Sequence, residues 1–357
     1  MKKILLAIAV LLTVQLADAQ VKSPEAAKKA IDAAQAAADN AKKATKVATW
    51  LKLATAYTDA YNAPKGSAWL GASKQELQLV MGSEKPVSSE TVVLGGDQYV
   101  KEVYANKELY FDANGILVMI NVTAPVCEDA LAKAVEAYAK AAEVDVKNTK
   151  TKDIKAGLKL INSNYLDDAM NSYMFQDYAK ASDLFAKAAA TLNTAPLNEV
   201  DTTALYNAGF TACAVAFVVL MLFMCAYYGF IPGMVANVAL VLNFFFTFGV
   251  LISFQAALTM SGIAGLVLSL GMAVDANVLI YERTKEELRA GKKIKEALAQ
   301  GYSNAFSAIF DSNLTSIITA IILYNFGTGA IRGFALTLGI GICASFFTAV
   351  WLTRMTY

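Results

Sequence analysis

Hydrophobic residues are distributed unevenly along this chain. Up to about residue 207 they alternate with Lys, Asp and Glu, whereas the remainder holds five long apolar runs with few charges. Each run is about long enough to cross a hydrocarbon core of roughly 30 Å at about 1.5 Å per residue. The pattern predicts a polar region followed by a five-helix transmembrane bundle in residues 208–357, with helices at about 208–228, 234–254, 258–281, 304–326 and 331–353.

The polar region, residues 20–207, has the composition of a helical array. Residues 25–61 are rich in Ala and Lys and almost free of Gly and Pro, which favours closely packed helices. Small, aromatic and small residues recur at the spacing typical of the second helix of a tetratricopeptide repeat: Ala181, Phe185 and Ala188, and again Ala134, Tyr138 and Ala141. We therefore expect a repeat-like helical region, and the alternative is an unrelated Ala-rich helical domain.

The sequence pattern changes between residues 88 and 122. There, β-branched and aromatic residues cluster around two turn signals, Gly95-Gly96 and the segment 112–115. This pattern predicts three or four short strands inserted into the helical region. The expected fold class is therefore mostly α, with a small β insertion and a C-terminal transmembrane bundle.

The N-terminus has the pattern of a secretory signal peptide. Two Lys precede an apolar stretch, and small residues at Ala17 and Ala19 suit cleavage after Ala19. A short retained anchor is the alternative. A cleaved signal peptide in residues 1–19 places the polar region outside the cytoplasm.

A second topology signal lies in the polar connection between the third and fourth apolar runs, residues 282–303. Its cations are Arg283, Lys285, Arg289, Lys292, Lys293 and Lys295. The positive-inside rule assigns such a connection to the cytoplasm. Counting back through three helices then places residue 208 outside, in agreement with the signal peptide.

Composition excludes several function classes. The chain has 357 residues, 56% hydrophobic content and a net charge of +1, so it lacks the basic excess that nucleic-acid binding requires. There is no His, which excludes a His-based triad or His zinc site, and the four Cys suggest neither a disulfide framework nor a metal site. We expect no cofactor, no metal and no enzymatic activity.

The candidate chemistry is carried by two aspartates in apolar runs. An ionisable residue at membrane depth costs several kcal/mol, about 2.5–3.5 on insertion scales, and usually marks an ion or proton path. Asp275 and Asp311 lie near the cytoplasmic ends of consecutive antiparallel helices, so they are expected at similar depth. Asn277, Asn313 and Thr315 are polar neighbours that could hydrogen-bond a carboxylate. The alternative is a structural role, with these residues as interhelical packing contacts.

Two long motifs contain these aspartates: GMAVDANVLIYERTKEELRAGK and GYSNAFSAIFDSNLTSIITAIILYNFGTGAIRGFALTLGIG. From about residue 213 onward the chain resembles the C-terminal membrane part of the SecD/SecF family, which is similar to RND-type transporters. By this resemblance, Asp275 matches the proton-conducting aspartate of the first motif. Asp311, Asn313 and Thr315 match the second motif.

The resemblance implies a multi-pass protein of the bacterial cytoplasmic membrane that assists preprotein translocation with the proton gradient. The implied partners are the SecYEG channel, a SecF-like subunit, preproteins and the lipid bilayer. The family's first transmembrane helix, its large extracytoplasmic domain and the SecF-like half have no counterpart in this sequence. The alternative is therefore a membrane-tethered extracytoplasmic protein-binding module of the tetratricopeptide type, in a chimeric or truncated reading frame. An RND-like small-molecule exporter is less favoured, because the substrate-binding domains of that class are also missing.

Overall fold

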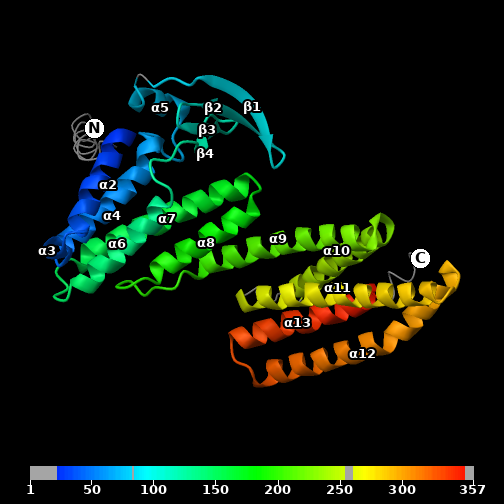
Figure 1. Cartoon of the computed structure of the whole chain (residues 1–357). Coiled ribbons are helices and arrows are strands. Elements are labelled where there is room, and N and C mark those ends of the chain that lie inside the picture. The colour runs from blue at the N-terminus through cyan, green and yellow to red at the C-terminus, as the bar shows by residue number, and fades with distance from the viewer. Residues whose placement is uncertain (1–21, 83, 254–259, 350–357) are drawn as a thin grey trace, which may run out of the picture. The chain divides into compact units, whose positions relative to one another are not determined.

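The computed structural model of this chain describes residues 22–82, 84–253 and 260–349. Two compact units are present, one ending at Ala204 and the other beginning at Leu205 (Figure 1). The predicted signal peptide, residues 1–19, and the last four residues of the last predicted helix, 350–353, lie outside the described residues.

The first unit is built mainly from helices. They are α2 (Pro24–Ala38), α3 (Ala41–Ala44), α4 (Val47–Asn62), the 3-10 turn η1 (Ala63–Lys65), α5 (Lys74–Val80), α6 (Ala130–Val144), α7 (Thr151–Met174) and α8 (Tyr178–Leu192). The long helices pack in chain order: α2 against α4, α4 against α6, α6 against α7 and α7 against α8 (Figure 1).

Small residues let these helices approach closely. An added Cβ on Gly157 of α7 would overlap the ring of Tyr138 from α6, so only glycine fits beneath this tyrosine. The six residues with tetratricopeptide-like spacing are all buried: Ala134, Tyr138, Ala141, Ala181, Phe185 and Ala188. The helical prediction is confirmed, whereas the assignment to tetratricopeptide repeats stays a prediction.

A four-stranded antiparallel sheet interrupts the helices, in the order β1 (Ser88–Leu94), β2 (Asp97–Val103), β3 (Lys107–Phe111) and β4 (Leu117–Val122). Gly95 and Gly96 form the first hairpin turn with positive φ angles of 62° and 97°, a conformation that glycine adopts readily. At the last turn, Asp112 Oδ1 accepts hydrogen bonds from the backbone amides of Asn114 (2.9 Å) and Ile116 (2.8 Å). The predicted β insertion is thus confirmed, and the fold is mostly α.

The second unit contains five helices that are long and apolar enough to cross a membrane, within the described ranges. They are α9 (Thr202–Tyr228), α10 (Phe230–Ser253), α11 (Met260–Arg289), α12 (Ile294–Phe326) and α13 (Ala330–Phe347). Helix α11 packs against α10, α12 and α13 (Figure 1). The contact between α11 and α13 is close at Gly265, where an added Cβ would lie 2.8 Å from the carbonyl oxygen of Phe334.

The predicted connection 282–303 is mostly helical, which corrects the expected helix ends. Helix α11 continues to Arg289 and α12 already begins at Ile294, so only residues 290–293 connect them. The extension of α11 consists of good helix formers whose side chains pair at i, i+3, for example Arg283 with Glu286 at 2.7 Å. Hydropathy marks where an apolar segment ends, but a helix continues as long as its polar residues support it.

Candidate functional site

Asp275 lies on the outward side of α11. Its carboxylate is exposed, whereas Ala276, Asn277 and Ile280 are buried against the neighbouring helices. Gly271, one turn earlier, is exposed on the same side, and no described atom lies within 4 Å of a Cβ added there. On this side of α11 the Asp275 carboxylate therefore lies one turn from a glycine and two turns from the exposed Leu268.

Asp311 lies on an exposed side of α12. Thr315 and Thr319 follow at i, i+4 spacing and are exposed as well, so the three residues form the predicted polar stripe. The two hydroxyls do not bind the carboxylate. Thr315 Oγ1 donates to the backbone carbonyl of Asp311 at 2.9 Å, and Thr319 Oγ1 donates to that of Thr315 at 3.0 Å.

The two asparagines point inward, away from the exposed stripes. Asn277 and Asn313 are only 2% and 6% exposed. Asn313 Nδ2 donates to the carbonyl oxygen of Ile309 at 2.7 Å, and Asn277 Nδ2 donates to that of Ala273 at 3.4 Å. The five predicted residues thus divide into an outward set, Asp275, Asp311 and Thr315, and an inward set, Asn277 and Asn313.

The carboxylates of Asp275 and Asp311 have no hydrogen-bond or ion-pair partners among the described residues. Within residues 22–82, 84–253 and 260–349, neither Asp275 nor Asp311 forms a hydrogen bond or an ion pair through its side chain, with the other or with any cation. Carboxylates on outward faces of apolar helices are unfavourable next to hydrocarbon. The arrangement is chemically suited to an acid that exchanges protons once a polar surface covers it.

Sequence reasoning missed a polar pair inside the bundle. Asn243 and Thr247 of α10 are 0% and 1% exposed, and among the described residues no hydrogen-bond partner is found for the Asn243 amide or the Thr247 hydroxyl. Their signal was available, because they are polar residues at i, i+4 within an apolar run. Buried polar groups of this kind belong with the carboxylates as candidate residues of a polar path.

A second candidate site lies in the first unit. A pocket of about 450 Å³ is lined by residues of α4, η1, β4, α6, α7 and α8. At its wall, Tyr61 OH donates to Asp168 Oδ1 at 2.8 Å and accepts from Lys65 Nζ at 2.5 Å, while Lys65 Nζ lies 3.6 Å from Asp168 Oδ1.

Burial shapes the charges of this cluster. It lowers the pKa of Lys65, against the opposing effect of Asp168. Burial, followed by the neighbouring Asp168 carboxylate, raises the pKa of Tyr61 well above its usual value. Tyr61 and Asp168 are too far apart in sequence to form a motif, so no sequence signal could have found the cluster. In the part of the chain that the structure describes, no group of three or more Cys, Asp or Glu residues is placed to hold a metal ion.

The match to a protein family begins in α8 of the first unit and extends through the second unit. Residues 180–356 match the family described as "Protein export membrane protein SecD/SecF, C-terminal". The protein translocase subunit SecD of Magnetococcus marinus is 55% identical over 148 residues, which cover 41% of this chain and 28% of that protein. SecD of Haemophilus influenzae is 52% identical over 147 residues, 41% of this chain and 24% of that protein.

Among solved structures, a crystal structure of SecDF from Thermus thermophilus, described as a translocon-associated membrane protein, is similar at 24% identity with a TM-score of 0.41. The match covers 76% of this chain and 36% of that one. The curated relatives above are matched over only about a quarter of their length.

Within the described ranges, five helices are long and apolar enough to cross a membrane, and α11 and α12 among them carry Asp275 and Asp311, which supports a multi-pass membrane protein. The sequence similarity over residues 180–356 is more specific evidence than the apolar helices. Residues 180–356 of this chain match the C-terminal part of the SecD/SecF family of protein-export membrane proteins, and about 150 residues are 50% or more identical to SecD relatives.

Proposed function

We propose that this chain assists preprotein translocation across the bacterial cytoplasmic membrane and uses the proton gradient to do so. Asp275 is the acid that takes up and releases the proton, and Asp311 is its polar neighbour on the next helix. In this proposal the N-terminal unit is extracytoplasmic, and the partners are the SecYEG channel, preproteins and a SecF-like subunit. Similarity to SecD supports the substrate class, and the outward carboxylates support the mechanism.

The observation that carries the mechanism is the placement of Asp275. A buried structural aspartate would have hydrogen-bond donors from the neighbouring helices, but this carboxylate faces away from them. Gly271, one turn before it on α11, lets another helix approach closely. A SecF-like bundle on this face would cover the carboxylates and complete the path.

The test is translocation of a preprotein into proteoliposomes that contain the channel, this chain and a SecF-like subunit, with and without a proton gradient. Asp275→Asn should leave membrane insertion intact and abolish the stimulation that depends on the gradient. The matched control is Glu286→Gln on the same helix, where the carboxylate is exposed and paired with Arg283 outside the apolar segment. Full stimulation by the Asp275→Asn protein would refute the proposal.

A second candidate function is a membrane-tethered extracytoplasmic module that binds protein. It is favoured by the pocket beside Tyr61, Lys65 and Asp168 in the first unit. In this case Asp275→Asn should have no effect, and deletion of residues 25–200 should abolish partner capture in a pull-down. The two candidates therefore predict opposite results for the same pair of variants.

A further inference from the structure

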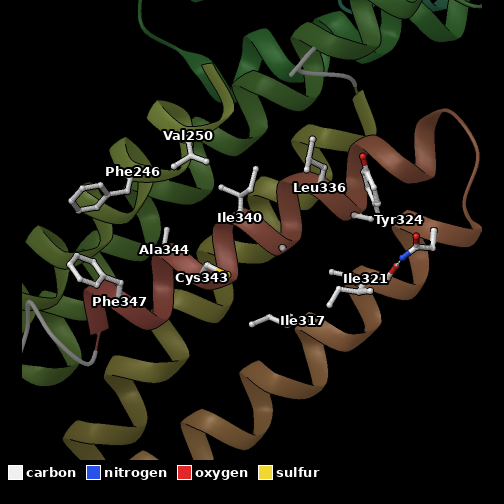
Figure 2. Close-up of a pocket in the computed structure, with 14 residues that line it drawn as sticks. Phe246, Val250, Ile317, Ile321, Tyr324, Leu336, Ile340, Cys343, Ala344 and Phe347 are labelled. Atoms are coloured by element: carbon white, nitrogen blue, oxygen red, sulfur yellow. Dashed lines mark hydrogen bonds between the residues drawn. The ribbon is translucent and has the colours of Figure 1, made fainter. Parts of the chain in front are cut away.

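The second unit carries a groove whose lining does not include Asp275 or Asp311. It has a volume of about 570 Å³ and is lined by α10, α12 and α13 (Figure 2). Its lining is almost entirely apolar, and the polar side chains of Tyr324 and Asn325 are both at the end of α12 that leads into α13. At the other end, the rings of Phe246 and Phe347 meet edge to face with centroids 5.9 Å apart (Figure 2).

The length and the cross-section of the groove indicate what kind of molecule occupies it. On α13 the lining runs from Ala335 to Phe347, which is about 18 Å at the helical rise, so the volume of about 570 Å³ corresponds to a mean cross-section of about 32 Å². A transmembrane helix about 10 Å wide has a cross-section of about 80 Å², so it would enter the groove only in part. A single hydrocarbon chain does fit, and it suits the apolar walls.

A cation lies directly beyond the polar end. Arg332, Leu336 and Ile340 follow one another at i, i+4 spacing, so Arg332 is on the groove side of α13, one turn beyond the lining. Its Nε donates to the carbonyl oxygen of Gly327 at 2.9 Å, which fixes the side chain next to the α12–α13 connection. Among the described residues Arg332 has no carboxylate partner, and it is exposed.

We propose that this groove is a phospholipid site, with one acyl chain between α10, α12 and α13 and the phosphate at Arg332. The lipid belongs to the leaflet on the side of the α12–α13 connection, opposite the basic α11–α12 connection. Arginine is well suited to phosphate, which it binds through two parallel N–H donors. Tyr324 and Asn325 lie at the depth of the glycerol ester, where amphipathic side chains are common.

The groove is separate from the face proposed for proton transfer. On α12, Ile317 and Ile321 line the groove, and they lie about 120° and about 80° around the helix from Asp311. A bundle that covers Asp311 therefore leaves room for a lipid at the groove, and the lipid site does not depend on the proposed function.

The experiment uses the full chain in vesicles of phosphatidylethanolamine and phosphatidylglycerol with a trace of phospholipid that carries a photoreactive group near the end of one acyl chain. After irradiation, mass spectrometry locates the cross-linked residues. We expect cross-links to concentrate on groove residues such as Cys343 and Phe347. Ile340→Trp, which fills the groove, should lower them about tenfold, the effect of about two lost methylene contacts.

Two further variants make the result decisive. Val238→Trp on α10 is the matched control, because Val238 is 52% exposed and does not line the groove. It should leave the cross-links unchanged. If Ile340→Trp does not insert, Ala344→Phe fills the same groove from the next turn. Arg332→Gln should weaken cross-linking without moving its position.

The proposal would be overturned if cross-links were spread over all exposed helix faces in proportion to their exposure and did not respond to either filling variant. So would efficient disulfide formation between Cys343 residues of two copies, because the groove would then be a protein interface.

Discussion

The contact between α11 and α13 yields a prediction with a built-in control. Gly265→Ala places a methyl group 2.8 Å from the carbonyl oxygen of Phe334 and 3.3 Å from the amide nitrogen of Leu338. Ordinary carbon–oxygen contacts are about 3.3–3.6 Å, so α13 must retreat by about 0.5–0.8 Å. Gly271→Ala on the same helix meets no described atom within 4 Å. The two variants therefore share the change in helix propensity and differ only in packing.

The magnitude follows from this difference. Overpacking of a well-filled contact costs about 1–3 kcal/mol, while the replacement of Gly by Ala favours the helix by about 1 kcal/mol at either position. We expect Gly271→Ala to leave the free energy of unfolding unchanged or slightly raised. Gly265→Ala should lower that free energy by about 1–3 kcal/mol relative to Gly271→Ala.

The assay is unfolding by dodecyl sulfate in mixed micelles. The fraction unfolded is measured by thiol labelling of Cys213 and Cys225. Both are half-buried on α9, and replacing Cys127 and Cys343 with Ser removes the other thiols. If the two variants unfold at the same denaturant fraction, the backbone approach at Gly265 does not stabilise the bundle and the reasoning is wrong.

Two further predictions concern the first unit. Lys107 is 1% exposed and its ammonium binds both carboxylate oxygens of Glu84, at 2.9 and 3.0 Å. Glu84→Gln should therefore lower the free energy of unfolding, measured with denaturant, by about 2 kcal/mol. Adding Lys107→Met to this variant should recover part of the loss. Burial tends to raise the pKa of Asp145, but hydrogen bonds from the backbone amide of Lys150, and from the hydroxyl and amide of Thr149, outweigh it and hold the pKa below its usual value. Since the folded-state pKa is the lower one, this stabilisation is complete above about pH 5 and is lost as the pH falls through about 4 and below. The stability difference between the natural protein and Asp145→Asn should therefore shrink in acid, and a difference that is constant between pH 7 and 3 would contradict the assignment.

The membrane spans were predictable because backbone groups in a bilayer must be satisfied within a helix, so a long apolar run has few alternatives. The ends of α11 and α12 were not, because the charged residues between 282 and 303 are themselves good helix formers. The sheet could be expected from β-branched and aromatic residues between glycine turns. Its contacts with α5 and α7, through Leu77 and Met174, depend on packing between distant segments and left no local pattern.

The candidate site was predictable residue by residue but not as an arrangement. Asp275 and Asn277 are adjacent in the motif, yet two residues on a helix are about 200° apart, so one faces outward and the other inward. The same holds for Asp311 and Asn313. Helical geometry predicts this opposition, whereas the direction of each face is set by where the neighbouring helices pack. Thr315 shares the face of Asp311 as expected, but its hydroxyl is taken by the helix backbone.

The two sites on α12 make the proposed roles separable. The carboxylate face carries Asp311 and Thr315, whereas the groove face carries Ile317 and Ile321, about 120° away. If a partner bundle covers the first face and a lipid the second, each can be disturbed alone. Ile340→Trp should therefore reduce lipid cross-linking while gradient-dependent translocation persists, and Asp275→Asn should do the reverse. Loss of both activities in either variant would show that the two sites are coupled and would contradict their separation.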